Sequence, residues 1–230
     1  MTGTDSTTGV LLARTKKLKR IEELLKFGRL RFSRLSSYRQ HAGAAIGDPN
    51  EGVGLHYSSD NPTLKTTVTI VGGPTFEMTS DDFKKMIVER QERHHGVLCM
   101  TYFPLEPDGL HRAGPLEDFV KDPRNREFGD TMAIFKNSVG FVERLTAAAK
   151  AKGFELWSGP VTYLPADHCG QVNPFNKIGD YAHQREWRFV TTTPLPDEHL
   201  DLELGNLVDL VTLIDLNQVP VNKLATEQHR

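Results

Sequence analysis

The chain has 230 residues, a length that suits one large domain with a sizeable core. Its 38% hydrophobic and 25% charged residues are ordinary for a globular protein, and a formal charge of -2 argues against a protein that binds nucleic acid through its overall charge, although a local basic patch lies near the N-terminus. Two cysteines, Cys99 and Cys169, argue against a disulfide framework and favour a reducing compartment. With neither a signal peptide nor an apolar run of membrane-spanning length recognisable, we expect a cytoplasmic protein without membrane contact.

The N-terminal part of the chain predicts one helix and one strand. Residues 1–13 are expected to form a flexible arm, followed by a single domain over 14–220 and a C-terminal tail over 221–230. Apolar residues at helical spacing predict a helix that begins near Thr15 and ends at Gly28, a typical C-cap residue. The alternation of apolar and polar residues then predicts a half-buried strand over 29–35.

The rest of the chain alternates between regular elements and long loops. Further strands are predicted over 65–78 as a hairpin, 96–103, 130–135, 154–163 and 207–216, and further helices over 79–93 and 137–153. Long irregular regions are predicted over 36–62, 104–130 and 165–180, of which the first two are expected to close over a cleft. Strands and helices do not alternate regularly, which indicates an α+β fold: a curved mixed or antiparallel sheet with about three helices and long loops.

The stretch from Tyr181 to Val190 combines ionisable groups and aromatic rings in a segment that otherwise reads as a strand. Alternation places Trp187 and Phe189 on one face, and Glu186 and Arg188 on the other. The amide of Gln184 and the carboxylate of Glu186 then lie side by side, an arrangement that suits hydrogen bonding to a polyhydroxylated substrate such as ribose. The alternative interpretation is an edge strand held by cross-strand ion pairs.

Metal and thiol chemistry find less support in the sequence. Histidines and cysteines occur close together at His94-His95…Cys99 and at His168-Cys169. Their spacing matches no compact zinc pattern, and neither cysteine lies in the local signature of a nucleophile. We therefore predict no metal site.

A carboxylate beside arginines and tyrosines suits cleavage of the bond between nicotinamide and ribose in NAD. Such an enzyme needs cations for the diphosphate, an aromatic ring against nicotinamide, and a carboxylate that stabilises an oxocarbenium-like ribose. The chain resembles the ADP-ribosyltransferases, in which an arginine on the first strand and a serine-containing strand precede a Gln-x-Glu motif. The matching residues are Arg31 or Arg29, Ser138 or Ser158, and Gln184-Arg185-Glu186, but the chain lacks the Ser-Thr-Ser run of that family.

A second resemblance covers more of the chain. The segments 27–33, 48–52, 97–103 and 175–189 are similar to a large group of bacterial proteins that are often encoded near phage-defence genes and have no generally assigned reaction. The resemblance implies that a set of polar residues forms one cluster: Arg31, Asp48, Glu51, Lys177, Tyr181, Gln184, Glu186 and Arg188.

Together these patterns lead to the hypothesis of an ADP-ribosyltransferase-like enzyme that uses NAD as a substrate and modifies a protein or a nucleic acid, in phage defence or as a toxin. Glu186 would orient the ribose and activate the acceptor, and Gln184 would position that acceptor. The expected NAD-binding residues are Arg31, Arg29, Tyr38, Tyr181, Lys177 and Arg188, with Tyr181 stacked on nicotinamide and the strand 29–35 beside the strand 184–190.

Two alternatives remain open at the level of sequence. The same cluster would be purely structural in a non-enzymatic defence or interaction protein. The basic segment 14–39 would carry the function in a nucleic-acid binder or nuclease.

Overall fold

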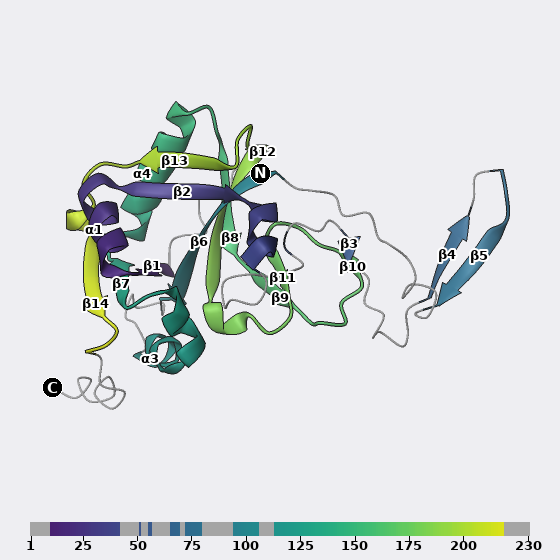
Figure 1. Ribbon diagram of the computed structural model, residues 1–230, viewed down its shortest axis with the longest axis horizontal. Helices are drawn as coiled ribbons and strands as arrows, with labels where there is room; N and C mark the ends of the chain where they lie inside the picture. Colours follow the sequence, from purple (N-terminus) through teal and green to yellow (C-terminus); the bar gives the residue numbers. More distant parts are fainter. Residues whose placement is uncertain are drawn as a thin grey trace.

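Apolar runs from both halves of the chain build one eight-stranded, antiparallel sheet (Figure 1). The computed structural model describes residues 10–41, 51, 55–56, 65–69, 72–79, 94–105 and 113–218. The strands of the large sheet are β1 (Val10–Lys16), β2 (Arg29–Arg34), β6 (His95–Pro104), β7 (Thr131–Phe135), β8 (Leu156–Pro160), β12 (Glu186–Pro194), β13 (His199–Glu203) and β14 (Val211–Asp215). The predicted α+β class, with a single domain, is confirmed.

Strand β6 is the centre of this sheet. One of its edges pairs with β12, from Glu186 opposite Thr101 to Val190 opposite Val97. Its other edge is shared by two strands: β2 pairs at residues 96–97, and β1 pairs at residues 101–104. Residues 98–100 therefore face a gap on this edge, where β1 and β2 diverge.

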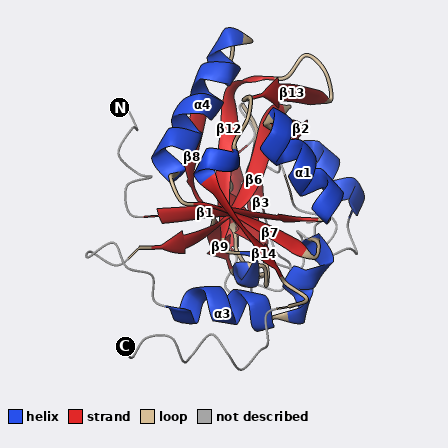
Figure 2. Ribbon diagram, turned by 90° about the vertical axis from the view of Figure 1, so that its left-hand side faces the viewer, coloured by secondary structure: helices blue, strands red, loops and turns tan. Residues whose placement is uncertain are grey.

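Helices cover both faces of the sheet, as Figure 2 shows. Helices α1 (Leu18–Phe27) and α4 (Ser138–Ala151) enclose the larger core, in which Phe141 packs against Phe135 at a ring-centroid distance of 4.1 Å. On the other face, α3 (Ala113–Lys121) brings Phe119 against Phe103 of β6. Among the described residues, no helix is both long and apolar enough to cross a membrane.

The remaining elements are short. Two-stranded pairings join β4 (Lys65–Thr69) to β5 (Thr75–Thr79), β3 (Leu55–His56) to β10 (Gly170–Gln171), and β9 (Thr162–Leu164) to β11 (Asn176–Ile178), the last in parallel. The 3-10 helices are η1 (Leu35–His41), η2 (Pro123–Phe128), η3 (Ala182–Gln184) and η4 (Val208–Leu210).

Several predicted elements are confirmed, and local chemistry explains them. Gly28 ends α1 in the left-handed conformation, and its backbone N–H is bonded to the Leu24 carbonyl. The side chain of Asn137 accepts a hydrogen bond from the Gly140 N–H and caps α4. The hairpin of β4 and β5 lies where the alternation predicted it, and the central strand β6 lies where the apolar run predicted it.

Other expectations are wrong, mostly because pairing between distant strands leaves no local sequence pattern. Residues 10–13 are not a flexible arm but the first part of β1, which pairs with β6 and, from Leu12 onward, with β7. The region 104–130 is not irregular throughout, since it contains α3 and η2. The single strand predicted over 154–163 is two strands with different partners, and β13 was not predicted. The glycine-rich loop over 42–50 lies outside the described residues, as does the helix predicted over 79–93 except for Thr79, which ends β5.

Candidate functional site

The side chains of strand β12 alternate between the apolar core on one face of the sheet and a polar cluster on the other, as the sequence predicted. Trp187 and Phe189 pack in the large core with α1 and α4. Glu186 and Arg188 point to the opposite face and are 5% and 1% exposed. Since buried charges require partners, the neighbours of these two residues define the site.

Those neighbours form a buried network of two cations and two carboxylates. The Nε of Arg188 donates to Glu186 Oε1 at 2.5 Å, and its Nη2 donates to Glu51 Oε1. The Nζ of Lys177 donates to Glu186 Oε2 at 3.2 Å and to Gln184 Oε1 at 2.8 Å. The Arg188 guanidinium also donates to the carbonyl of Pro174 at 2.6 Å. The charges balance, and the structure brings together Glu51, Lys177, Gln184, Glu186 and Arg188, as the second resemblance implied.

The two carboxylates of the network differ in acidity. Burial by itself would raise the pKa of Glu186, but the charges of Arg188 and Lys177 outweigh it and lower the pKa to about 2. Burial raises the pKa of Glu51, which the same cations offset only in part. Glu186 is therefore ionised throughout the physiological range, and it is a weak proton acceptor.

Glu186 and Gln184 line a small cavity of about 100 Å³. Tyr38 and Cys99 line the same cavity, and burial raises the pKa of both side chains. Lys177 and Arg188 do not line it, although both donate hydrogen bonds to the Glu186 carboxylate. Tyr181 lies against Lys177, with the ammonium 4.7 Å from the ring centroid.

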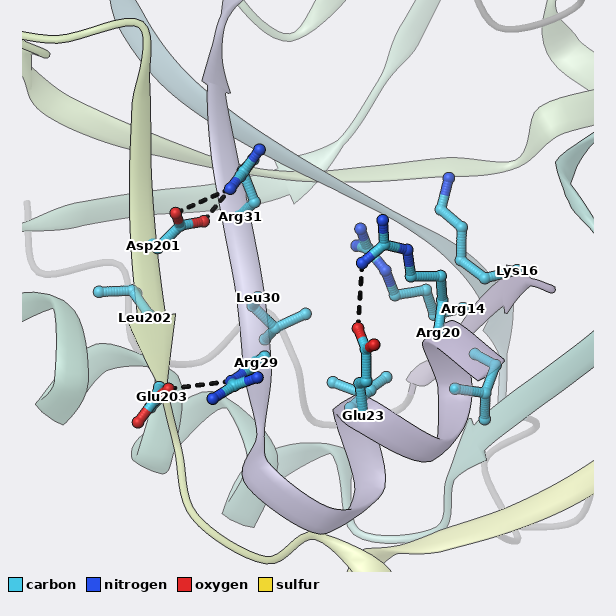
Figure 3. A pocket seen from close by; sticks show the side chains of 12 residues that line it. Arg14, Lys16, Arg20, Glu23, Arg29, Leu30, Arg31, Asp201, Leu202 and Glu203 are labelled. Atoms are coloured by element: carbon cyan, nitrogen blue, oxygen red, sulfur yellow. Dashed lines mark hydrogen bonds and ion pairs between the residues drawn. The ribbon is translucent and has the colours of Figure 1, made fainter. Parts of the chain in front are cut away.

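A larger cavity of about 660 Å³ lies between α1, β1, β2 and β13 (Figure 3). Its lining includes three ion pairs: Arg20 with Glu23, Arg29 with Glu203, and Arg31 with Asp201. Figure 3 shows that the arginines of β2 reach toward the acids of β13, whereas Arg14, Lys16, Arg20 and Glu23 lie on the other side of β2.

Arg14 and Lys16 line both cavities and have no ion-pair partner among the residues that the structure describes. The guanidinium of Arg14 occupies the gap between β1 and β2, where its Nη1 donates to the Cys99 carbonyl at 3.1 Å. Burial lowers the pKa of Arg14, and burial together with the charge of Arg14 lowers the pKa of Lys16 to about 8. Two adjacent, partly buried cations without a carboxylate are suited to hold an anion from outside the chain.

Some residues of the sequence-based hypothesis lie elsewhere. Strand β6 lies between β2 and β12, so the strand 29–35 is not beside the strand 184–190. Arg29 and Arg31 are exposed, and each forms an ion pair with an acidic residue of β13. Asp48 lies outside the described residues.

Neither candidate serine for the middle strand reaches Glu186. Ser138 begins α4, where its hydroxyl accepts a hydrogen bond from the Leu12 N–H. Ser158 pairs with Phe189 across β8 and β12, which places it on the face of the sheet opposite to Glu186.

The sequence-based hypothesis missed Arg14 and Lys16. Their only signal was the run of four apolar residues at 10–13 directly before them, which is consistent with a short buried strand. Assigning residues 1–13 to an arm and residues from 15 onward to a helix concealed it.

Among the described residues, no three histidine, cysteine, aspartate or glutamate side chains are grouped as a metal site would require. The chain matches no protein-family model, no curated protein and no solved structure.

Proposed function

We propose that the protein is an NAD-using enzyme that transfers ADP-ribose, with Arg14 and Lys16 holding the diphosphate and Glu186 stabilising the reacting ribose. The observation that carries this proposal is that two of the cations lining the large cavity, Arg14 and Lys16, have no carboxylate partner among the described residues and also line the small cavity that contains Gln184 and Glu186. A ligand with a central dianion and a ribose at one end matches this arrangement.

Size and charge support a dinucleotide in the larger cavity. Its volume of about 660 Å³ lies within the range of small-molecule sites. Each of its three carboxylates is engaged by an arginine, so two positive charges are left for an anion. The diphosphate of NAD carries two negative charges, which would neutralise Arg14 and Lys16 and remove the cost of keeping them partly buried.

The proposed reaction breaks one bond and forms one bond at C1′ of the ribose. Nicotinamide leaves with the electron pair of the glycosidic bond, the ribose gains oxocarbenium character, and a nucleophilic atom of the acceptor attacks C1′ and loses its proton to water. The ionised carboxylate of Glu186 stabilises the developing positive charge. With a pKa of about 2, Glu186 is a poor base. Its role is therefore electrostatic, and it does not activate the acceptor by removing a proton.

Gln184 and Tyr38 complete the small cavity. Gln184 lines this cavity together with Glu186, and Lys177 holds its side-chain oxygen in place. We assign it the positioning of the ribose or acceptor hydroxyl. Tyr38 supplies an aromatic wall for nicotinamide, while Tyr181 packs on Lys177 and takes no part in binding NAD.

The test is calorimetric titration of NAD into the purified protein, with free nicotinamide followed chromatographically in the same samples. We expect saturable binding and slow nicotinamide release by the parent, and a loss of binding of about tenfold or more in Arg14→Ala. Arg31→Ala is the matched control, because Arg31 is exposed and paired with Asp201. The absence of both binding and nicotinamide release, or an equal effect of the two substitutions, contradicts the proposal.

A further inference from the structure

The charge of this chain is strongly uneven along its length. Ten of its 28 lysines and arginines lie between Arg14 and Arg39, together with only two of its 30 acidic residues. The rest of the chain is therefore acidic, although the total charge is only -2. Such an asymmetry directs a polyanion to one side of the molecule.

The structure sorts these cations into paired and unpaired groups. Arg20, Arg29 and Arg31 are held by carboxylates, and the guanidinium of Arg34 donates to the carbonyls of Leu195 and Pro196. Of the cations between Arg14 and Arg39, those that are exposed and have no ion-pair partner among the described residues are Lys17, Lys19 and Lys26. All three belong to α1 or its N-cap, and α1 forms one wall of the large cavity.

An exposed aromatic ring lies at the end of this helix. Phe27 is 39% exposed, with the Lys26 ammonium 5.1 Å and the Arg29 guanidinium 4.7 Å from its ring centroid. A ring flanked by cations is typical of surfaces that stack a nucleobase while neutralising the neighbouring phosphates. A protein acceptor needs neither feature.

We infer that α1 binds a single-stranded nucleic acid, with phosphates on Lys17, Lys19 and Lys26 and a base against Phe27. If the proposed function holds, this nucleic acid is the acceptor of ADP-ribose. Gln184 and Glu186 are each 5% exposed in a cavity of about 100 Å³, so only an unstacked base or a free strand end can bring an atom to them. A base within a duplex cannot enter such a cavity.

The experiment is fluorescence anisotropy with labelled single-stranded DNA, single-stranded RNA and duplex DNA of one sequence, without NAD. For about three to five phosphate contacts, raising the salt from about 50 to about 200 mM weakens single-strand binding roughly 20- to 130-fold. The double substitution Lys19→Ala with Lys26→Ala reduces the slope of log affinity against log salt by about 1.4. Lys150→Ala with Lys152→Ala, two exposed lysines at the end of α4, is the control and leaves the slope unchanged.

Phe27→Leu separates stacking from charge. It weakens binding of single strands severalfold without changing the salt slope. Equal binding by the parent and the Lys19→Ala, Lys26→Ala variant overturns the inference, as does tighter binding of the duplex or modification of an acidic protein alone.

The inference and the proposed function fail separately. Nicotinamide release without oligonucleotide binding removes the nucleic-acid acceptor and leaves the NAD chemistry intact. Oligonucleotide binding without nicotinamide release supports the surface on α1 and removes ADP-ribose transfer.

Discussion

Replacing Glu186 with glutamine removes one charge from a network in which two cations and two carboxylates balance. Lys177 Nζ and Arg188 Nε, which lie 3.2 and 2.5 Å from the Glu186 carboxylate, then share the single carboxylate of Glu51, and all of these side chains are nearly completely buried. Breaking a buried pair in this way costs about 3–5 kcal/mol. With an unfolding entropy of about 2.1 cal/mol/K per residue, a chain of 230 residues loses roughly 6–10 °C in Tm.

Loss of stability alone would not identify a catalytic role, so the matched variant is Glu51→Gln. Glu51 belongs to the same network but does not line the cavity of Gln184 and Glu186. Both variants should show a similar decrease in Tm by differential scanning calorimetry. Nicotinamide release, measured well below both midpoints, should fall about 100-fold or more only in Glu186→Gln, as expected when electrostatic stabilisation of a transition state is removed. An equal loss of turnover in the two variants refutes the reasoning and favours a purely structural cluster.

Three further predictions follow from the same geometry. The pKa of Glu186 is lowered to about 2 from 4.5, so its stabilising effect is present above pH 4.5 and is lost as the pH falls toward 2; urea unfolding should show the stability gap between parent and Glu186→Gln closing over this window. The pKa of Lys16 is lowered to about 8, so affinity for pyrophosphate should fall as the pH rises through 8, with proton uptake on binding near that pH that calorimetry in two buffers detects and that Lys16→Ala abolishes. Gly129 has a φ of +148°, and a Cβ there would lie 2.2 Å from the carbonyl carbon of Lys16; Gly129→Ala should lower both Tm and anion affinity, whereas Gly153→Ala, with no atom within 4 Å of its added Cβ, should cost only backbone strain and leave affinity unchanged.

The elements that could be predicted from the sequence are those with local causes. The two faces of β12 follow from the alternation of Trp187 and Phe189 with Glu186 and Arg188, and the beginning of α4 follows from its Asn137 cap. Glu51 and Lys177 could be associated with Glu186 only through the resemblance, since no spacing along the chain brings them together. Their contacts depend on how the loops before β12 fold back.

Strand order could not be predicted, because pairing between distant segments leaves no local pattern. Residues 10–13 are a short apolar run at the end of a polar segment, and only burial between β6 and β7 makes them a strand. Similarly, nothing in the strand over 29–35 indicates that β13 will supply its carboxylates or that β6 will separate it from β12. The phosphate role was therefore assigned to Arg29 and Arg31, which the structure shows already paired.

The network around Glu186 and the pair Arg14 and Lys16 call for different explanations. A buried network with balanced charges can be kept for a structural reason, although apolar residues of similar size often stabilise a fold as well or better. Arg14 and Lys16 have no such balance: burial lowers the pKa of both, and among the described residues no carboxylate compensates them. They therefore cost stability in the free protein. They are also positioned where β1 leaves β6, the point at which the two cavities share a wall. A bound anion would offset the free-energy cost of burying these two charges, which no carboxylate among the described residues offsets. For this reason the functional assignment depends more on Arg14 and Lys16 than on Glu186.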